Sequence, residues 1–87
     1  MPNLYNVIDD VHEQMFNNSP SIKFDIVRHG RERWIVYIRL PYAEQSAKLE
    51  FLISGENDDE VAGSVLRNGS VSNRVIARIM DSVIERF

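Results

Sequence analysis

Apolar residues recur at helical spacing near the start of the chain. At about 100° per residue, one helical face carries Leu4, Val7, Ile8, Val11 and Met15. Asn3 precedes this run, and its side chain can cap a helix by accepting a hydrogen bond from a free backbone amide. Pro20 disfavours helical geometry in the residue before it. The pattern therefore predicts a helix over residues 4–17.

The middle of the chain changes to alternation with a period of two, which is typical of a strand with one buried face. Three segments show this pattern, at residues 22–26, 34–40 and 47–53. The first two flank a short connection at Gly30, a residue free to adopt positive φ, and we expect them to form a hairpin. An odd-length loop near Gly30 would place Phe24 and Val36 on one face. The prediction is a three-stranded antiparallel meander.

Two helices are predicted after the strands. Asn57 followed by Glu60 resembles a capping box, and Gly69 suits the left-handed residue that ends a helix. The apolar residues of this short helix would be Val61, Ala62, Val65 and Leu66. A longer helix is predicted from Ser72, a candidate N-cap, to Phe87. Its apolar residues cover more than half of its circumference.

These elements predict a two-layer α+β fold. A three-stranded antiparallel meander would be packed on one face by the N-terminal and C-terminal helices, in the order α-β-β-β-α-α. A chain of 87 residues has room for one modest core. We therefore expect residues 1–87 to form a single domain, and we find no linker or internal repeat within it.

Composition removes several classes of protein. The chain has 10 Lys and Arg, 13 Asp and Glu, a formal net charge of −3, 44% hydrophobic residues and no cysteine. Without thiols it has neither a disulfide scaffold nor a cysteine-based metal site. Its apolar content argues against disorder. No apolar run approaches the roughly 20 residues of a membrane span, and residues 1–20 lack the basic start of a secretory signal. We therefore expect a cytoplasmic protein.

Catalytic and metal-binding motifs are missing from the sequence. His12 and His29 are its only imidazoles, and no nucleophile elbow or phosphate-binding glycine loop accompanies them. The acidic run at residues 56–60 lacks the spacing of a calcium loop. We therefore expect no enzyme activity, no metal and no cofactor.

One face of the predicted sheet is left uncovered by the helices. Its apolar and aromatic centre with charged surroundings is the composition of a moderate protein interface. We therefore predict a small protein-binding module, such as a regulator, adaptor or inhibitor, with a partner of unknown identity and no membrane association. The predicted partner-binding residues are Val27, Ile35, Tyr37, Arg39 and Leu52, with Arg31 and Arg33 adding peripheral charge.

The last helix offers a second surface, because its apolar arc is too wide for one contact. Met80 and Ile84 face away from the row formed by residues 71, 75 and 79. They need another neighbour, which is either the predicted short helix or a second copy of the chain. A homodimer through this helix would be isologous, with Met80 and Ile84 meeting their symmetry mates.

Nucleic acid is the alternative partner. Residues 19–55 carry six basic and four acidic groups. The predicted hairpin tip is basic, with Arg28, His29, Arg31 and Arg33, and Tyr37 on the exposed sheet face is placed to stack on a base. A helix, three strands and a helix are also the order of double-stranded-RNA-binding domains, which is an analogy of fold alone. The acidic start of the predicted short helix would repel phosphates, and the chain as a whole is acidic. A protein partner is therefore preferred.

Overall fold

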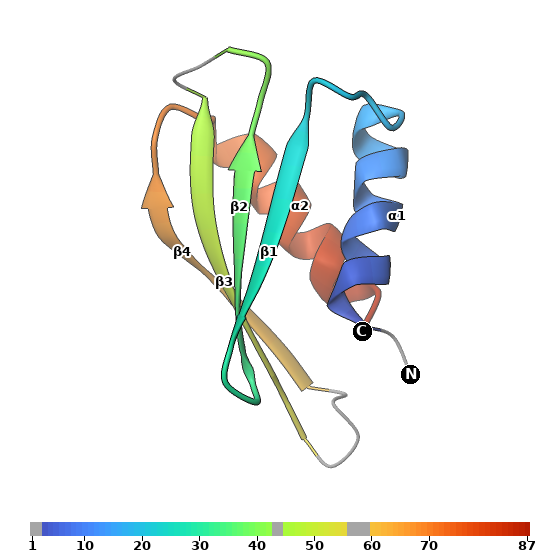
Figure 1. Ribbon diagram of the computed structural model, residues 1–87, viewed down its shortest axis with the longest axis vertical. Helices are drawn as coiled ribbons and strands as arrows, with labels where there is room; N and C mark the ends of the chain where they lie inside the picture. The colour runs from blue at the N-terminus through green and yellow to red at the C-terminus, as the bar shows by residue number, and fades with distance from the viewer. Residues whose placement is uncertain (1–2, 43–44, 56–59) are drawn as a thin grey trace.

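The computed structural model describes residues 3–42, 45–55 and 60–87. The elements are, in chain order, α1 (Leu4–Phe16), β1 (Lys23–His29), β2 (Arg33–Arg39), β3 (Ser46–Ser54), β4 (Glu60–Asn68) and α2 (Asn73–Glu85). The strands form one antiparallel sheet in the order β1-β2-β3-β4. The helices lie on one side of this sheet, and α2 crosses behind the strands in Figure 1. The α+β class and the antiparallel sheet are thus as predicted.

Both helices begin with the caps that the sequence predicts. The Asn3 side chain accepts a hydrogen bond from the Asn6 amide at 3.1 Å, and the Ser72 hydroxyl accepts one from the Val75 amide at 3.3 Å. Helix α1 ends just before Asn17, which adopts the left-handed conformation with φ 53°. Asparagine tolerates this conformation better than most residues. The helix therefore ends at the left-handed Asn17, three residues before Pro20.

The first hairpin has the register that alternation predicts. Phe24 lies opposite Ile38, and Ile26 lies opposite Val36. The connection between β1 and β2 opens with Gly30, whose φ of +84° is the left-handed geometry expected of a glycine there. The buried face of β2 is thereby turned towards the helices.

The structure has a fourth strand where the sequence predicts a short helix. Strand β4 pairs with β3 from Ala47 opposite Asn68 to Ser54 opposite Glu60. The prediction of three strands and the order α-β-β-β-α-α is therefore wrong, because the described chain has four strands and two helices. The proposed cap Asn57 lies outside the described residues.

The physical reason for this difference is that the apolar spacing in this segment suits both structures. The run of residues 61–66 fits a helical face, and it also contains the alternating series Val61, Gly63 and Val65. Glycine and β-branched valine both lower helix propensity, and pairing with β3 then decides the outcome. Gly69, the expected helix terminator, has no positive φ. Its backbone amide instead donates to the Ser46 carbonyl at 2.9 Å.

The core lies between the sheet and the two helices. Its central side chains are almost fully buried, and they include Val11 of α1, Val36 of β2, Leu49 and Phe51 of β3, and Ile79 and Val83 of α2. Gly63 lets α2 approach β4, because a Cβ at this position would lie 2.5 Å from the Met80 Cε. Met80 therefore has β4 as its intramolecular neighbour, in place of the predicted short helix.

Candidate partner-binding face

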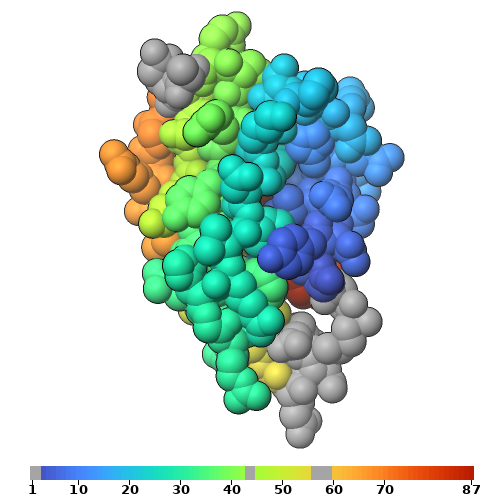
Figure 2. All heavy atoms as spheres, in the orientation of Figure 1, coloured from blue at the N-terminus to red at the C-terminus, as the bar shows by residue number. Residues whose placement is uncertain are grey.

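The sheet surface opposite the helices is called the open face here. In Figure 2 its strands form the front of the molecule, while α2 is almost hidden behind them. Large side chains remain 40–43% exposed on it, namely Val27, Tyr37, Leu52 and Leu66. Most other apolar side chains of the molecule are buried in the core. These four exposed side chains therefore give the open face an apolar centre.

Ile35 behaves differently from the other predicted partner-binding residues. It belongs to the open face but is only 1% exposed, since it lies between Val27 of β1 and Glu50 of β3. A side chain so deeply covered cannot be part of the contact surface. Ile35 instead supports the exposed residues around it.

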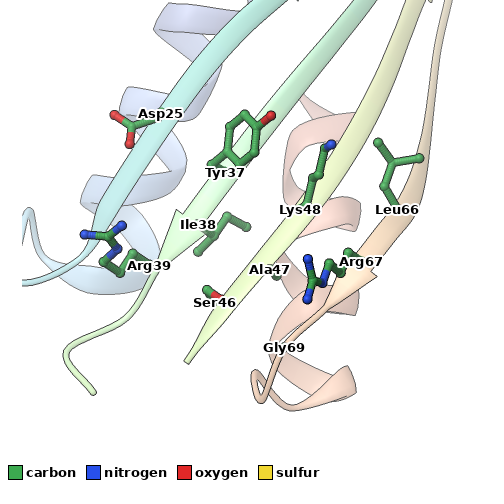
Figure 3. Close-up of a pocket in the computed structure, with 10 residues that line it drawn as sticks. All are labelled: Asp25, Tyr37, Ile38, Arg39, Ser46, Ala47, Lys48, Leu66, Arg67 and Gly69. Carbon is green, nitrogen blue, oxygen red and sulfur yellow. The ribbon is translucent and has the colours of Figure 1, made fainter. Parts of the chain in front are cut away.

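A hollow of about 620 Å³ lies at one end of the open face (Figure 3). Its lining comes from all four strands and includes Asp25, Tyr37, Arg39, Lys48, Leu66 and Arg67. The sequence predicted Tyr37 and Arg39 for this surface. It missed Leu66 and Arg67 because both were assigned to a helix, and the alternation at residues 61–65 was the signal that could have placed them.

The hollow is positively charged. Arg39, Lys48 and Arg67 come from three different strands, and Asp25 is the one acidic residue of the lining. In the described parts of the chain, none of these three cations forms a salt bridge. Lys48 lies over the Tyr37 ring, with its Nζ 5.5 Å from the ring centroid, which is a cation–π distance. An anionic group would find uncompensated positive charge here.

The basic residues near the β1–β2 turn are less available than the sequence suggests. The Arg28 guanidinium lies 4.9 Å from the Trp34 ring centroid and donates hydrogen bonds to the carbonyls of Gly30 and Arg31. Arg33 forms an ion pair with Glu50. Arg28 therefore holds the β1–β2 turn, and Arg33 links β2 to β3. His29 and the charged Arg31 side chain remain exposed near the turn.

The remaining chemical candidates have structural surroundings. The His12 Nε2 lies 2.9 Å from the Ile22 carbonyl, and its ring packs edge-on against Phe24. This contact ties α1 to the start of β1. Within the described ranges, no group of three His, Asp or Glu side chains is placed to hold a metal ion. Most of the acidic run at 56–60 lies outside these ranges.

The two residues predicted for a dimer contact have different environments. Met80 is partly buried against the core beside Gly63, whereas Ile84 is 39% exposed. On this flank of α2, β4 therefore covers Met80, whereas Ile84, one turn later, is open to solvent.

Comparisons with known proteins identify no relative of this chain. No family model, no curated protein and no solved structure matches it significantly. Among the described helices, none is long and apolar enough to cross a membrane. The open face is thus the main guide to function.

Proposed function

We propose that this protein is a non-catalytic protein-binding module, serving as a regulator, adaptor or inhibitor. Its open face docks a segment of another protein that combines acidic with apolar side chains. The observation that carries this proposal is the hollow, where Arg39, Lys48 and Arg67 lack carboxylate partners in the described chain. Tyr37 and Leu66 border the same space with exposed apolar surface.

The chemistry of this surface supports a protein partner in two ways. Tyrosine and arginine are enriched among the residues that dominate binding energy at interfaces, and Tyr37 and Arg39 stand together here. The unpaired positive charge would accelerate encounter with an acidic segment and fix its position. Val27 and Leu52 extend the apolar contact away from the hollow.

Nucleic acid remains the second candidate because Tyr37 and Lys48 offer stacking and charge side by side. Other features count against it. Asp25 and Glu50 share the open face, two of the hairpin cations are engaged internally, and the chain has a net charge of −3. The fourth strand also removes the topological analogy with double-stranded-RNA-binding domains.

Selection from a random-peptide display library on the immobilised full chain tests the protein-binding proposal. We expect the selected peptides to carry Asp or Glu beside aliphatic or aromatic residues. Tyr37→Ala and Lys48→Glu should each weaken binding of a selected peptide by about tenfold or more, measured by fluorescence anisotropy. The matched control is Arg78→Glu, which makes a similar charge change at an exposed position of α2.

Two results would contradict the proposal. One is selection of peptides without acidic residues, and the other is full binding by the Lys48→Glu variant. Anisotropy with labelled single-stranded and double-stranded RNA examines the second candidate in parallel. We expect neither RNA to bind at about 50 mM salt, where phosphate contacts are strong. Salt-sensitive RNA binding that is weakened in the Arg31→Glu, Arg33→Glu double variant would favour nucleic acid instead.

A further inference from the structure

Strand β4 forms one edge of the sheet, so one row of its backbone amides and carbonyls has no strand partner in the described chain. Such an edge is a template for pairing with another strand unless it is blocked. Neighbouring side chains on it are well exposed, at 47% for Val65 and 41% for Leu66. The strand runs from Glu60 to Asn68, which is long enough for several backbone hydrogen bonds.

The sequence of β4 is complementary to itself when two copies run antiparallel about Gly63. In that register Val61 lies opposite Val65 of the second copy, on the side of the sheet that carries the helices. Ala62 lies opposite Ser64 of the second copy. The register shift in β4 places Arg67 on the open face, opposite Lys48. Glu60 of one copy lies opposite Leu66 of the other, which is the extra residue of the bulge, and therefore next to Arg67 on the same face. The two-fold axis repeats this arrangement at both ends of the pairing.

Helix α2 adds an apolar flank to the same edge. On one side α2 is joined to α1, where the Arg86 guanidinium donates to the Gln14 side chain. On the other side Met80 packs against Gly63 of β4, and Ile84 lies one turn further along this flank with 39% exposure. Val65 and Ile84 thus leave apolar surface where a second copy would arrive.

We propose that two copies of this chain associate through their β4 edges and join their sheets into one continuous antiparallel sheet. The interface is isologous, with its two-fold axis at Gly63. It places Met80 close to the axis, on the helix side. This proposal does not rest on the open-face function, because it is argued from the strand edge, although Arg67 also lines the hollow.

Disulfide crosslinking tests the register directly, since the native chain has no cysteine. Val61→Cys and Val65→Cys chains are purified separately, then mixed and oxidised mildly. We expect a crosslinked dimer in the mixture and little in either chain alone, because only the mixture brings the two thiols opposite each other. The control is a mixture of Val61→Cys with Arg78→Cys, whose thiol lies on the exposed side of α2. Equal crosslinking in that control would overturn the proposal.

Charge reversal gives a second arm, read by sedimentation equilibrium. Glu60→Arg or Arg67→Glu alone places like charges together at both ends of the interface, and we expect association to weaken by about tenfold. Mixing the two variants pairs opposite charges again, so association should return to the level of the native chain. A native chain that remains monomeric at about 1 mM would refute the dimer. Failure of the mixture to recover would refute this register. Because Arg67 also lines the hollow, peptide binding is compared in the Glu60→Arg variant, which should bind a selected peptide as the native chain does.

Discussion

The two faces of this sheet use the same strands for different purposes. On the helix side of β2 and β3, Val36, Leu49 and Phe51 are completely buried. On the open side of those strands, Tyr37 and Leu52 are about 40% exposed beside charged neighbours. Because side chains alternate along a strand, residues next to each other in sequence belong to different environments. Substitutions on the helix side should therefore change stability, whereas substitutions of the exposed open-face residues should leave the fold intact.

Ile35 shows that the open face is more than a polar covering. No helix lies over it, yet its neighbours in the sheet leave it only 1% exposed. Cross-strand packing with Val27 supplies part of this cover. The open face thus has a small apolar centre of its own, which holds the exposed residues in position. An intact open face therefore depends on one residue that is itself buried.

The largest effect is expected at Phe51. Phe51→Ala should lower the free energy of unfolding by about 3–5 kcal/mol, because it removes a ring at the centre of the core and leaves a cavity. Leu52→Ala, one position along β3, should cost less than about 1 kcal/mol because that side chain is 43% exposed. Urea denaturation of both variants measures the difference. If both variants lost a similar free energy of unfolding, the two faces would contribute equally to stability, and the contrast between them would be wrong.

The next largest effect is expected at Ile35, on the open side. Ile35→Ala should cost about 2–4 kcal/mol, as at a core position, although no helix covers this residue. Val27→Ala removes a partly exposed side chain opposite it and should cost no more than about 1 kcal/mol. Urea denaturation again compares them. If Ile35→Ala lowered the free energy of unfolding no more than Val27→Ala does, the open face would have no buried centre of its own.

Much of this fold could be predicted from local sequence. Alternation indicated three of the strands and the side of β2 that faces the helices. The caps Asn3 and Ser72 marked where the helices begin. These features depend on residues within a few positions of each other, so one sequence is sufficient to find them. For the same reason Tyr37 and Leu52 could be assigned to the open face.

Features that depend on distant residues were not predictable in this way. Strand β4 is stabilised by pairing with β3, and its apolar spacing alone fits a helix equally well. The predicted partner-binding face therefore lacked Leu66 and Arg67, and the hollow that they help to line was not predicted. The burial of Ile35 depends on neighbours from two other strands. Each of these features needs the sheet to be assembled before it can be seen.

The smallest change in stability is expected at Gly63, the residue of β4 against which α2 packs. A Cβ there would lie 2.5 Å from the Met80 Cε and 3.0 Å from the Phe51 Cε1. Replacing glycine by alanine in a strand normally stabilises by limiting the unfolded chain. The overlap should reverse this gain and leave a net loss of about 1–2 kcal/mol, moderated by the flexible end of Met80. Ser64→Ala, on the exposed side of β4, should stay within about 0.5 kcal/mol.

A double-mutant cycle with Met80→Ala isolates the cause of that loss. Shortening Met80 removes the atom nearest to the added Cβ, so Gly63→Ala should become neutral or stabilising in the Met80→Ala background. Urea denaturation of the four proteins gives the coupling free energy, which we expect to be at least about 1–2 kcal/mol in favour of the double variant. Zero coupling would mean that Phe51, or the backbone of β4, resists the added methyl group instead. In that case the approach of α2 to β4 would not depend on the missing side chain at Gly63.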